Sequence, residues 1–398
     1  MKNRFFKYYI LSITLAVFVW SCETTTKDPE PDLQPVTLVS STLVKEYTKE
    51  QLVASLGTQG QTYALFIQGG VKQYKLVYKT KNTDGTEIQA SGALVVPVIA
   101  NRNAPYPLAS YQHGTIFNEK DAPSYFSSEG DGSMASLLAT LGYIVAAPDY
   151  IGYGASNTLP HTYEHREGLA TASLDMLRAA KEFIKKEKLS WNNNVYIGGY
   201  SEGGFATMAL QKKIEEETGT EFNLKASSCG AGAYNKTLSF KTIATAPSEA
   251  NAGYNASYIW VLLTYDRIYK LNRPLTSYFA EPYASQIQKD KQNVSISASF
   301  NTIITDALKQ SLINGTDTAL MNAVKDNDIF DWKPKTPTLL LHGNADTYVP
   351  YFNTQTAYDA MIKRGATNVK LISVDKGTHS TSIQRFLQDT ISFFATNQ

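Results

Sequence analysis

The sequence predicts an α/β fold, in which a mostly parallel central sheet carries helices on both faces and a helical cap covers one edge. Three observations support this prediction. Short apolar runs alternate with amphipathic helical segments between residues 106 and 217, which is typical of βαβ units. The same alternation returns after residue 336. Between these parts, residues 236–334 show helical patterns and no clear strand, so they are predicted to form the cap over the ligand-binding edge.

The elements before the cap follow from local patterns. Residues 72–98 alternate apolar and polar side chains around an Asp-Gly turn, which predicts an antiparallel hairpin. Short, mainly apolar runs are typical of buried parallel strands, and they occur at 106–114, 144–154 and 194–200. Apolar residues at helical spacing predict helices at 133–143, 168–188 and 205–217.

The elements after the cap repeat this order. The apolar runs 336–343 and 369–377 are predicted strands, and 354–364 and the segment from 381 are predicted helices. Within the cap, 250–279 places five large side chains on one helical face: Tyr254, Tyr258, Leu262, Tyr265 and Tyr269. The simpler interpretation is that this stripe packs on the sheet domain. The alternative is that part of it lines a ligand pocket.

The first 35 residues are not expected to belong to the fold. Residues 1–21 combine a basic start with an apolar run that is short for a membrane span, and VWSC ends at Cys22. This pattern resembles a bacterial lipoprotein signal peptide, which implies cleavage before Cys22 and a lipid anchor in the cell envelope. The alternatives are an ordinary secretory signal and an uncleaved anchor. Residues 22–35 are rich in proline and acids, which predicts a disordered tether, so the α/β domain with its cap is expected at 36–398.

Composition excludes several other classes of protein. Apolar residues make up 43% of the 398 residues, which is enough for a large core. The net charge is +1 with no basic stripe, so we expect no nucleic-acid partner. The only cysteine besides Cys22 is Cys229, so no intrachain disulfide can form if Cys22 carries lipid. The apolar surroundings of Cys229 predict a buried, inert thiol. No cluster has metal-ligand spacing, so no metal and no cofactor are expected.

Residues 194–204 read NVYIGGYSEGG and place one serine among four glycines. The segment GYSEG is a G-x-S-x-G motif between a predicted strand and a predicted helix. A serine on such a sharp turn has a strained backbone, and Gly199 and Gly203 are required because a Cβ atom there would come too close. The motif therefore predicts that Ser201 is a nucleophile. The alternative is a glycine-rich turn in which the serine is incidental.

A serine nucleophile needs a histidine base. In folds with this type of turn, the acid and then the histidine follow the serine along the chain. Three of the five histidines precede Ser201, namely His113, His161 and His165. His379 lies on a loop between the last predicted strand and the last helix, where the base is expected. The alternative is an ordinary surface histidine. His342 ends a strand and is expected to pack under the next turn.

The base in turn needs an orienting carboxylate. Asp346 lies five residues beyond the strand end at Leu341, on a loop from which it can reach the imidazole of His379. Asp375 is a weaker candidate because it lies at the strand end just before His379 and is expected to face solvent. Asp331 precedes its strand and so lies at the wrong end. Asp149 follows a strand ahead of the serine and is interpreted as a structural turn acid.

The tetrahedral intermediate needs hydrogen-bond donors for its oxyanion. The backbone N–H of Glu202, at a helix N-terminus, is one expected donor. The second is expected from QHGT at 112–115, the loop after the third core strand. Thr115 is the favoured residue and Gly114 the alternative. The side chain of His113 is expected to be structural, hydrogen-bonded so as to shape the loop.

Several of these segments together are similar to the secretory lipase family and related bacterial serine esterases of the α/β-hydrolase superfamily. They are YQHGT, PDYIGYG, the helix with Asp175 and Arg178, GYSEGG, LHGNADTYVP and GTHS. The similarity extends over nearly everything after residue 60. It implies an α/β-hydrolase fold, a triad of Ser201, Asp346 and His379, a helical cap and ester substrates. Fungal members carry disulfides that this chain cannot form, so their preference for long acyl chains is not carried over.

The expected reaction is therefore acyl transfer from a small or polysaccharide-linked ester through a covalent intermediate on Ser201. Three alternatives remain. A peptidase of the prolyl-oligopeptidase type shares the triad order but usually needs a large N-terminal propeller, for which residues 36–60 are too few. A non-catalytic glycan- or lipid-binding scaffold has no reason to keep all three triad residues in order. A carbohydrate esterase that removes acetyl or feruloyl groups fits a cell-envelope protein as well as a lipid esterase does.

Overall fold

The computed structural model describes residues 36–398 apart from 56–63, 66 and 128–129. The predicted signal peptide, Cys22 and the predicted tether lie outside the described residues. Residues 36–398 form a single unit by their contacts. Among the described helices, none has the length and apolar character needed to cross a membrane.

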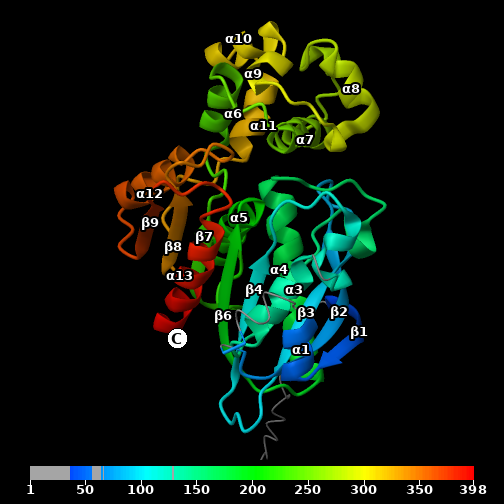
Figure 1. Cartoon of the computed structure of the whole chain (residues 1–398), viewed down its shortest axis with the longest axis vertical. Coiled ribbons are helices and arrows are strands. Elements are labelled where there is room, and N and C mark those ends of the chain that lie inside the picture. Colours follow the sequence, from blue (N-terminus) through cyan, green and yellow to red (C-terminus); the bar gives the residue numbers. More distant parts are fainter. Residues whose placement is uncertain (1–35, 56–63, 66, 128–129) are drawn as a thin grey trace, which may run out of the picture. The chain divides into compact units, whose positions relative to one another are not determined.

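One mostly parallel sheet forms the centre of the fold (Figure 1). Its strands, in spatial order, are β1 (Leu38–Tyr47), β2 (Gly70–Lys81), β3 (Glu87–Val98), β5 (Ile144–Pro148), β4 (Tyr106–Gln112), β6 (Trp191–Tyr200), β7 (Asn223–Gly230), β8 (Thr338–Gly343) and β9 (Val369–Val374). The pairs from β1 through β3 to β5 are antiparallel, and every pair from β5 through β4 to β9 is parallel. The sheet confirms the predicted α/β fold.

Helices cover both faces of the sheet because neighbouring strand residues point to opposite sides. In β3, Leu94 packs in a core with α4 (Arg166–Lys186) and α5 (Glu202–Glu217). The next residue, Val95, packs in a core with α1 (Lys49–Ser55), α3 (Asp131–Ala139) and α13 (Ile383–Thr396) on the other face. Helix α12 (Phe352–Lys363) packs on the same side as α5.

Six helices lie between β7 and β8 and form the cap. They are α6 (Lys236–Thr245), α7 (Ala252–Ile268), α8 (Tyr283–Asp290), α9 (Phe300–Ile303), α10 (Asp306–Asn314) and α11 (Thr318–Asp326). The cap has its own apolar core, which also includes Ile116, Tyr153 and Tyr163 from loops of the sheet domain. It is drawn in green to orange at the top of Figure 1, beyond the ends of β6, β7 and β8.

Two elements of the N-terminal part were not predicted. Strand β1 pairs with β2 at the edge of the sheet, and none of its residues is buried. The short helix α1 buries only Leu52. Most side chains of both elements face solvent, so neither shows the regular spacing of apolar residues from which the other strands and helices were predicted.

Candidate active site

Ser201 occupies a sharp turn that joins β6 directly to α5. Its φ is 61° and its ψ is −124°, a backbone conformation that is strained for any residue other than glycine. The turn is held by a hydrogen bond from the Ser201 N–H to the carbonyl of Gly230, 2.9 Å away on β7. Local strain of this kind persists only where the surrounding structure enforces it, and here it raises one hydroxyl above the end of the sheet.

The flanking glycines are needed for this turn. A Cβ atom at Gly199 would lie 2.4 Å from the Gln112 carbonyl oxygen, and one at Gly203 would lie 2.1 Å from the same atom. At Gly204 a Cβ atom would lie 2.0 Å from the carbonyl oxygen of Gly230. All three obstacles are main-chain atoms, which cannot move aside as a flexible side chain can. The glycines around Ser201 therefore allow α5 to start against the neighbouring strands.

The structure brings the three predicted triad residues together although they are far apart in sequence. His379 Nε2 lies 2.8 Å from the hydroxyl oxygen of Ser201, and His379 Nδ1 lies 2.6 Å from Asp346 Oδ2. A carboxylate only accepts hydrogen bonds, so Nδ1 carries the proton and Nε2 accepts from the serine hydroxyl. The imidazole is therefore in the tautomer that can take up the serine proton.

Asp346 is held in place by four donors. Its Oδ1 accepts from the backbone N–H groups of Tyr348 and Val349, both at 2.9 Å. Its Oδ2 accepts from His379 and, at 3.1 Å, from His342 Nε2. Burial alone would raise the pKa of the Asp346 carboxyl, but the interactions with His342 and His379 outweigh burial and lower the pKa from 3.8 to about 2. The carboxylate is thus ionised at any pH near neutral.

His342 is a partner of Asp346 that the sequence analysis did not identify. It is fully buried under the turn after β8, as expected, and its Nε2 also lies 2.8 Å from the carbonyl of Val349. Both neighbours of Nε2 are acceptors, so Nε2 carries a proton, and Nδ1 can accept from the Thr354 hydroxyl at 2.7 Å. The feature of the sequence that could have indicated this contact is the spacing of four residues between His342 and Asp346.

The expected oxyanion-hole residues lie next to the serine. Glu202 is the first residue of α5, where backbone N–H groups have no partner within the helix. A Cβ atom on Gly114 would lie 4.0 Å from Ser201 Cβ, so the loop after β4 passes directly beside the nucleophile. The Thr115 hydroxyl is 2.9 Å from the hydroxyl of Tyr163. The start of α5 and the loop after β4 therefore both lie beside Ser201.

Two buried histidines shape these loops. His113 is fully buried, with Nδ1 2.7 Å from the Gly114 carbonyl and Nε2 3.2 Å from the Asp149 carbonyl, in agreement with its expected structural place. His161 was given no place by the sequence analysis. Its Nε2 lies 2.8 Å from the carboxylate of Glu202 and its Nδ1 lies 2.7 Å from the Ile151 carbonyl. The Glu202 side chain is therefore fixed behind the turn that carries Ser201.

The remaining candidates do not join the site. The Asp149 carboxylate is buried and accepts from the Ser91 hydroxyl at 2.6 Å and the Ser124 N–H at 2.8 Å, as a structural acid does. Asp375 is exposed, and exposed Asp331 pairs with Arg364, the residue that follows α12. Cys229 is fully buried, and burial raises the pKa of its thiol to about 12. No group of metal-ligating side chains is present in the part of the chain that the structure describes.

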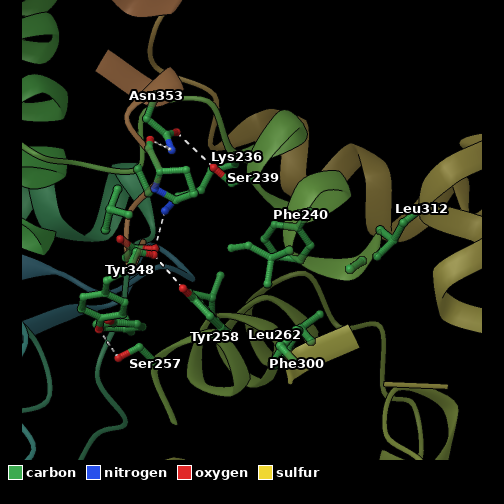
Figure 2. Close-up of a pocket in the computed structure, with 18 of the residues that line it drawn as sticks. Lys236, Ser239, Phe240, Ser257, Tyr258, Leu262, Phe300, Leu312, Tyr348 and Asn353 are labelled. Carbon is green, nitrogen blue, oxygen red and sulfur yellow. Dashed lines mark hydrogen bonds and ion pairs between the residues drawn. The ribbon is translucent and has the colours of Figure 1, made fainter. Parts of the chain in front are cut away.

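Ser201 lies in the wall of a cavity between the sheet domain and the cap. In Figure 2 the labelled polar residues Lys236, Ser239, Tyr348 and Asn353 gather on one side of this cavity. Labelled apolar residues continue it away from this group: Phe240, Leu262, Phe300 and Leu312. The cavity therefore has a polar part and an apolar part.

In the stripe of large side chains predicted at 250–279, some residues line the cavity and others pack against neighbouring elements. Tyr258 and Leu262 line the cavity. Tyr254 stacks on Tyr348, with ring centroids 4.1 Å apart. The hydroxyl of buried Tyr265 donates to the Glu164 carbonyl at 2.9 Å, and Tyr269, just beyond α7, donates to Asp326 at 2.6 Å. One helical face thus both anchors the cap and lines the cavity.

Comparison with known proteins places this site in a family. The model of the family described as secretory lipase matches residues 129–390, which is more than half of the chain. No curated protein matches the sequence. Among solved structures, the rice cell wall degrading esterase LipA from Xanthomonas oryzae is 25% identical, with a TM-score of 0.76 over 90% of this chain and 96% of that one.

Two further structures share the fold at lower identity. A hydrolase from Legionella pneumophila is 24% identical, with a TM-score of 0.81 over 90% of this chain and 98% of that one. Candida antarctica lipase A is 17% identical, with a TM-score of 0.64 over 91% and 82%. The family match and the esterase likeness make this protein a hydrolase of the carboxylesterase and lipase class. The chain belongs to the secretory lipase family.

Proposed function

We propose that this protein hydrolyses carboxylic esters through a covalent acyl-enzyme on Ser201. The observation that carries the proposal is the continuous hydrogen-bonded chain from Ser201, in the wall of the cavity, through His379 to Asp346. A serine hydroxyl is a weak nucleophile, and this arrangement supplies the base and the acid that orients the base.

The reaction proceeds in two halves. Ser201 Oγ attacks the ester carbonyl while His379 Nε2 takes the hydroxyl proton, and Asp346 stabilises the imidazolium that forms. His379 then gives this proton to the departing alcohol, and the C–O bond to the alcohol breaks. In the second half, His379 takes a proton from water, the hydroxide attacks the acyl carbon, and the proton returns to Ser201 as the carboxylic acid leaves.

Backbone amides stabilise the oxyanion in both halves. The N–H of Glu202 is one donor, and its place at the positive end of α5 favours a developing negative charge. The second donor is the N–H of Thr115, with Gly114 as the alternative on the same loop. This assignment is supported by the close approach of that loop to Ser201.

The acyl group enters the cavity, and its alkyl part extends toward Phe240, Leu262 and Leu312. Each methylene that leaves water for such surroundings gains about 0.8 kcal/mol. A cavity that leads from the nucleophile to an apolar part favours esters of aliphatic acids over peptides, whose flanking amides would lose their hydrogen bonds in that part.

We also propose that the mature protein is anchored in the cell envelope by lipid on Cys22. The support is the basic start, apolar run and cysteine of residues 1–22, together with membership in a family described as secretory. Replacement of Cys22 by serine should move the protein from the detergent phase to the aqueous phase of a cell extract. Retention in the detergent phase would contradict a lipid anchor at this residue.

Hydrolysis of p-nitrophenyl acetate, butyrate and octanoate by wild type and by the Ser201→Ala variant tests the proposed function. We expect turnover of all three esters by wild type and a loss of at least a thousandfold in the variant. A peptide p-nitroanilide serves as the competing substrate. Preferential cleavage of the anilide, or activity retained by the folded variant, would overturn the proposal.

A further inference from the structure

The wall of the cavity contains a buried pair of opposite charges, Glu164 and Lys236. Oε2 of Glu164 accepts a hydrogen bond from Lys236 Nζ, and both residues line the same cavity as Ser201. Removing two charges from water is energetically costly before their mutual attraction is counted. A channel that held only an alkyl chain would not need this pair in the cavity that contains the nucleophile.

The carboxyl end of this pair is more exposed than the ammonium end. The side chain of Lys236 is 2% exposed, and its Nζ also lies over the ring of Phe205 at 4.3 Å from the centroid. The side chain of Glu164 is 11% exposed. The residue has a φ of 48°, so the strained loop before α4 holds it in this position.

One carboxyl oxygen of Glu164 is available to a ligand. Within the described part of the chain, Oε1 has no hydrogen-bond partner, whereas Oε2 is taken by Lys236. Oε1 is also not among the fully enclosed polar atoms that lack a partner, so it is open to the cavity. Whether the pair is ionised or shares its proton as neutral groups, Oε1 remains an acceptor.

These features select the chemistry of a ligand group. The pair as a whole is neutral and offers an acceptor, so it suits a neutral hydroxyl better than an ammonium or a carboxylate. The apolar side chains of Phe240, Leu262 and Leu312 continue the cavity beyond the polar part and suit an alkyl tail (Figure 2). A chain that satisfies both parts carries a hydroxyl near its carbonyl group and an alkyl chain beyond.

We propose that the enzyme selects hydroxyacyl esters, whose hydroxyl group donates to Oε1 of Glu164 while the alkyl tail fills the apolar part of the cavity. The inference rests on the proposed function, because it assumes that the acyl group enters this cavity. Glu164 is then a residue that determines acyl specificity. Lys236 positions Glu164 and keeps its second oxygen occupied.

The test compares p-nitrophenyl octanoate with the p-nitrophenyl esters of 2-, 3- and 4-hydroxyoctanoate. For at least one position of the hydroxyl group, we expect kcat/KM of wild type to exceed that for octanoate by tenfold or more. The ratio is then measured in the Glu164→Met/Lys236→Met double variant, which removes both charges together and keeps unbranched side chains. We expect the ratio to fall to about one or below in this variant.

The Glu164→Gln variant is the matched control because its amide keeps an acceptor oxygen at this place. It should retain part of the preference, and it remains informative if the double variant fails to fold. Each ratio is taken within one protein, so a general loss of activity cancels. Equal rates on all four esters in wild type, or an unchanged ratio in both variants, would overturn the inference. Absence of hydrolysis of every ester by wild type would instead contradict the proposed function.

Discussion

Replacement of Asp346 by asparagine tests how the histidine is oriented. The carboxylate accepts four hydrogen bonds, from His379, His342 and the N–H groups of Tyr348 and Val349. If the asparagine oxygen keeps the hydrogen bonds from the two backbone N–H groups, its NH₂ group faces the ring N–H groups of His379 and His342. Donors then face donors. His379 can then accept at Nδ1 only by moving its proton to Nε2, which faces Ser201.

In that tautomer the imidazole cannot take the serine proton. We expect kcat on p-nitrophenyl butyrate to fall by about 10⁴, which corresponds to about 5 kcal/mol of transition-state stabilisation. The fold should also lose stability at neutral pH. The pKa of Asp346 is lowered from 3.8 to about 2, and a shift of this size is worth about 2 kcal/mol.

The lowered pKa of Asp346 determines how its contribution to stability depends on pH. The folded protein binds the proton of Asp346 more weakly than the unfolded chain does, so the stabilisation is fully present above pH 4. It is lost as the pH falls from about 4 to about 2. The difference in unfolding free energy between wild type and Asp346→Asn, measured by denaturant titration, should therefore shrink over this pH range.

The matched control is Asp375→Asn, which changes an exposed carboxylate four residues before His379. We expect it to change kcat less than threefold and the unfolding free energy by less than about 0.5 kcal/mol. A loss of kcat below tenfold in Asp346→Asn would refute the orienting role of Asp346. So would equal losses in the two variants.

Two further outcomes follow from the geometry. Gly203→Ala should lower both the activity and the thermal midpoint, because the new Cβ atom would lie 2.1 Å from the Gln112 carbonyl oxygen. The control is Gly253→Ala in α7, where the new Cβ atom would lie 3.4 Å from the nearest side-chain atom and should lower neither quantity. Equal effects of the two substitutions would contradict the steric argument. Leu262→Trp should block the apolar part of the cavity. If the tryptophan excludes three methylenes of the acyl chain, kcat/KM for p-nitrophenyl octanoate should fall by about 50-fold, whereas kcat/KM for p-nitrophenyl acetate should change only a fewfold. An equal effect on both esters would contradict binding of the acyl chain in this part of the cavity.

Much of the sheet domain could be predicted because its signals are local. The parallel strands are short apolar runs and the covering helices have regular apolar spacing, so both appear in the sequence. The G-x-S-x-G motif combines steric and chemical requirements within five residues. It also restricts the acid and the base to two loops further along the chain, and the structure brings Asp346 and His379 from these loops to Ser201.

Other features depend on contacts that no local pattern records. Strand β1 faces solvent and has no apolar period. Glu164 and Lys236 are 72 residues apart, and each alone would be taken for a surface charge. His342 was recognised as buried, but its contact with Asp346 depends on how the turn after β8 folds back. The cavity itself arises where the cap meets the sheet domain, so its volume and polarity are properties of the tertiary structure.

Covalent labelling shows most directly whether Ser201 is an activated nucleophile. A fluorophosphonate is added to wild type, Ser201→Ala and His379→Ala proteins, and the intact mass of each is measured. We expect one adduct on wild type, none on Ser201→Ala, and labelling of His379→Ala that is slower by at least a hundredfold. An adduct on folded Ser201→Ala, or equal labelling rates for wild type and His379→Ala, would contradict an activated serine at position 201.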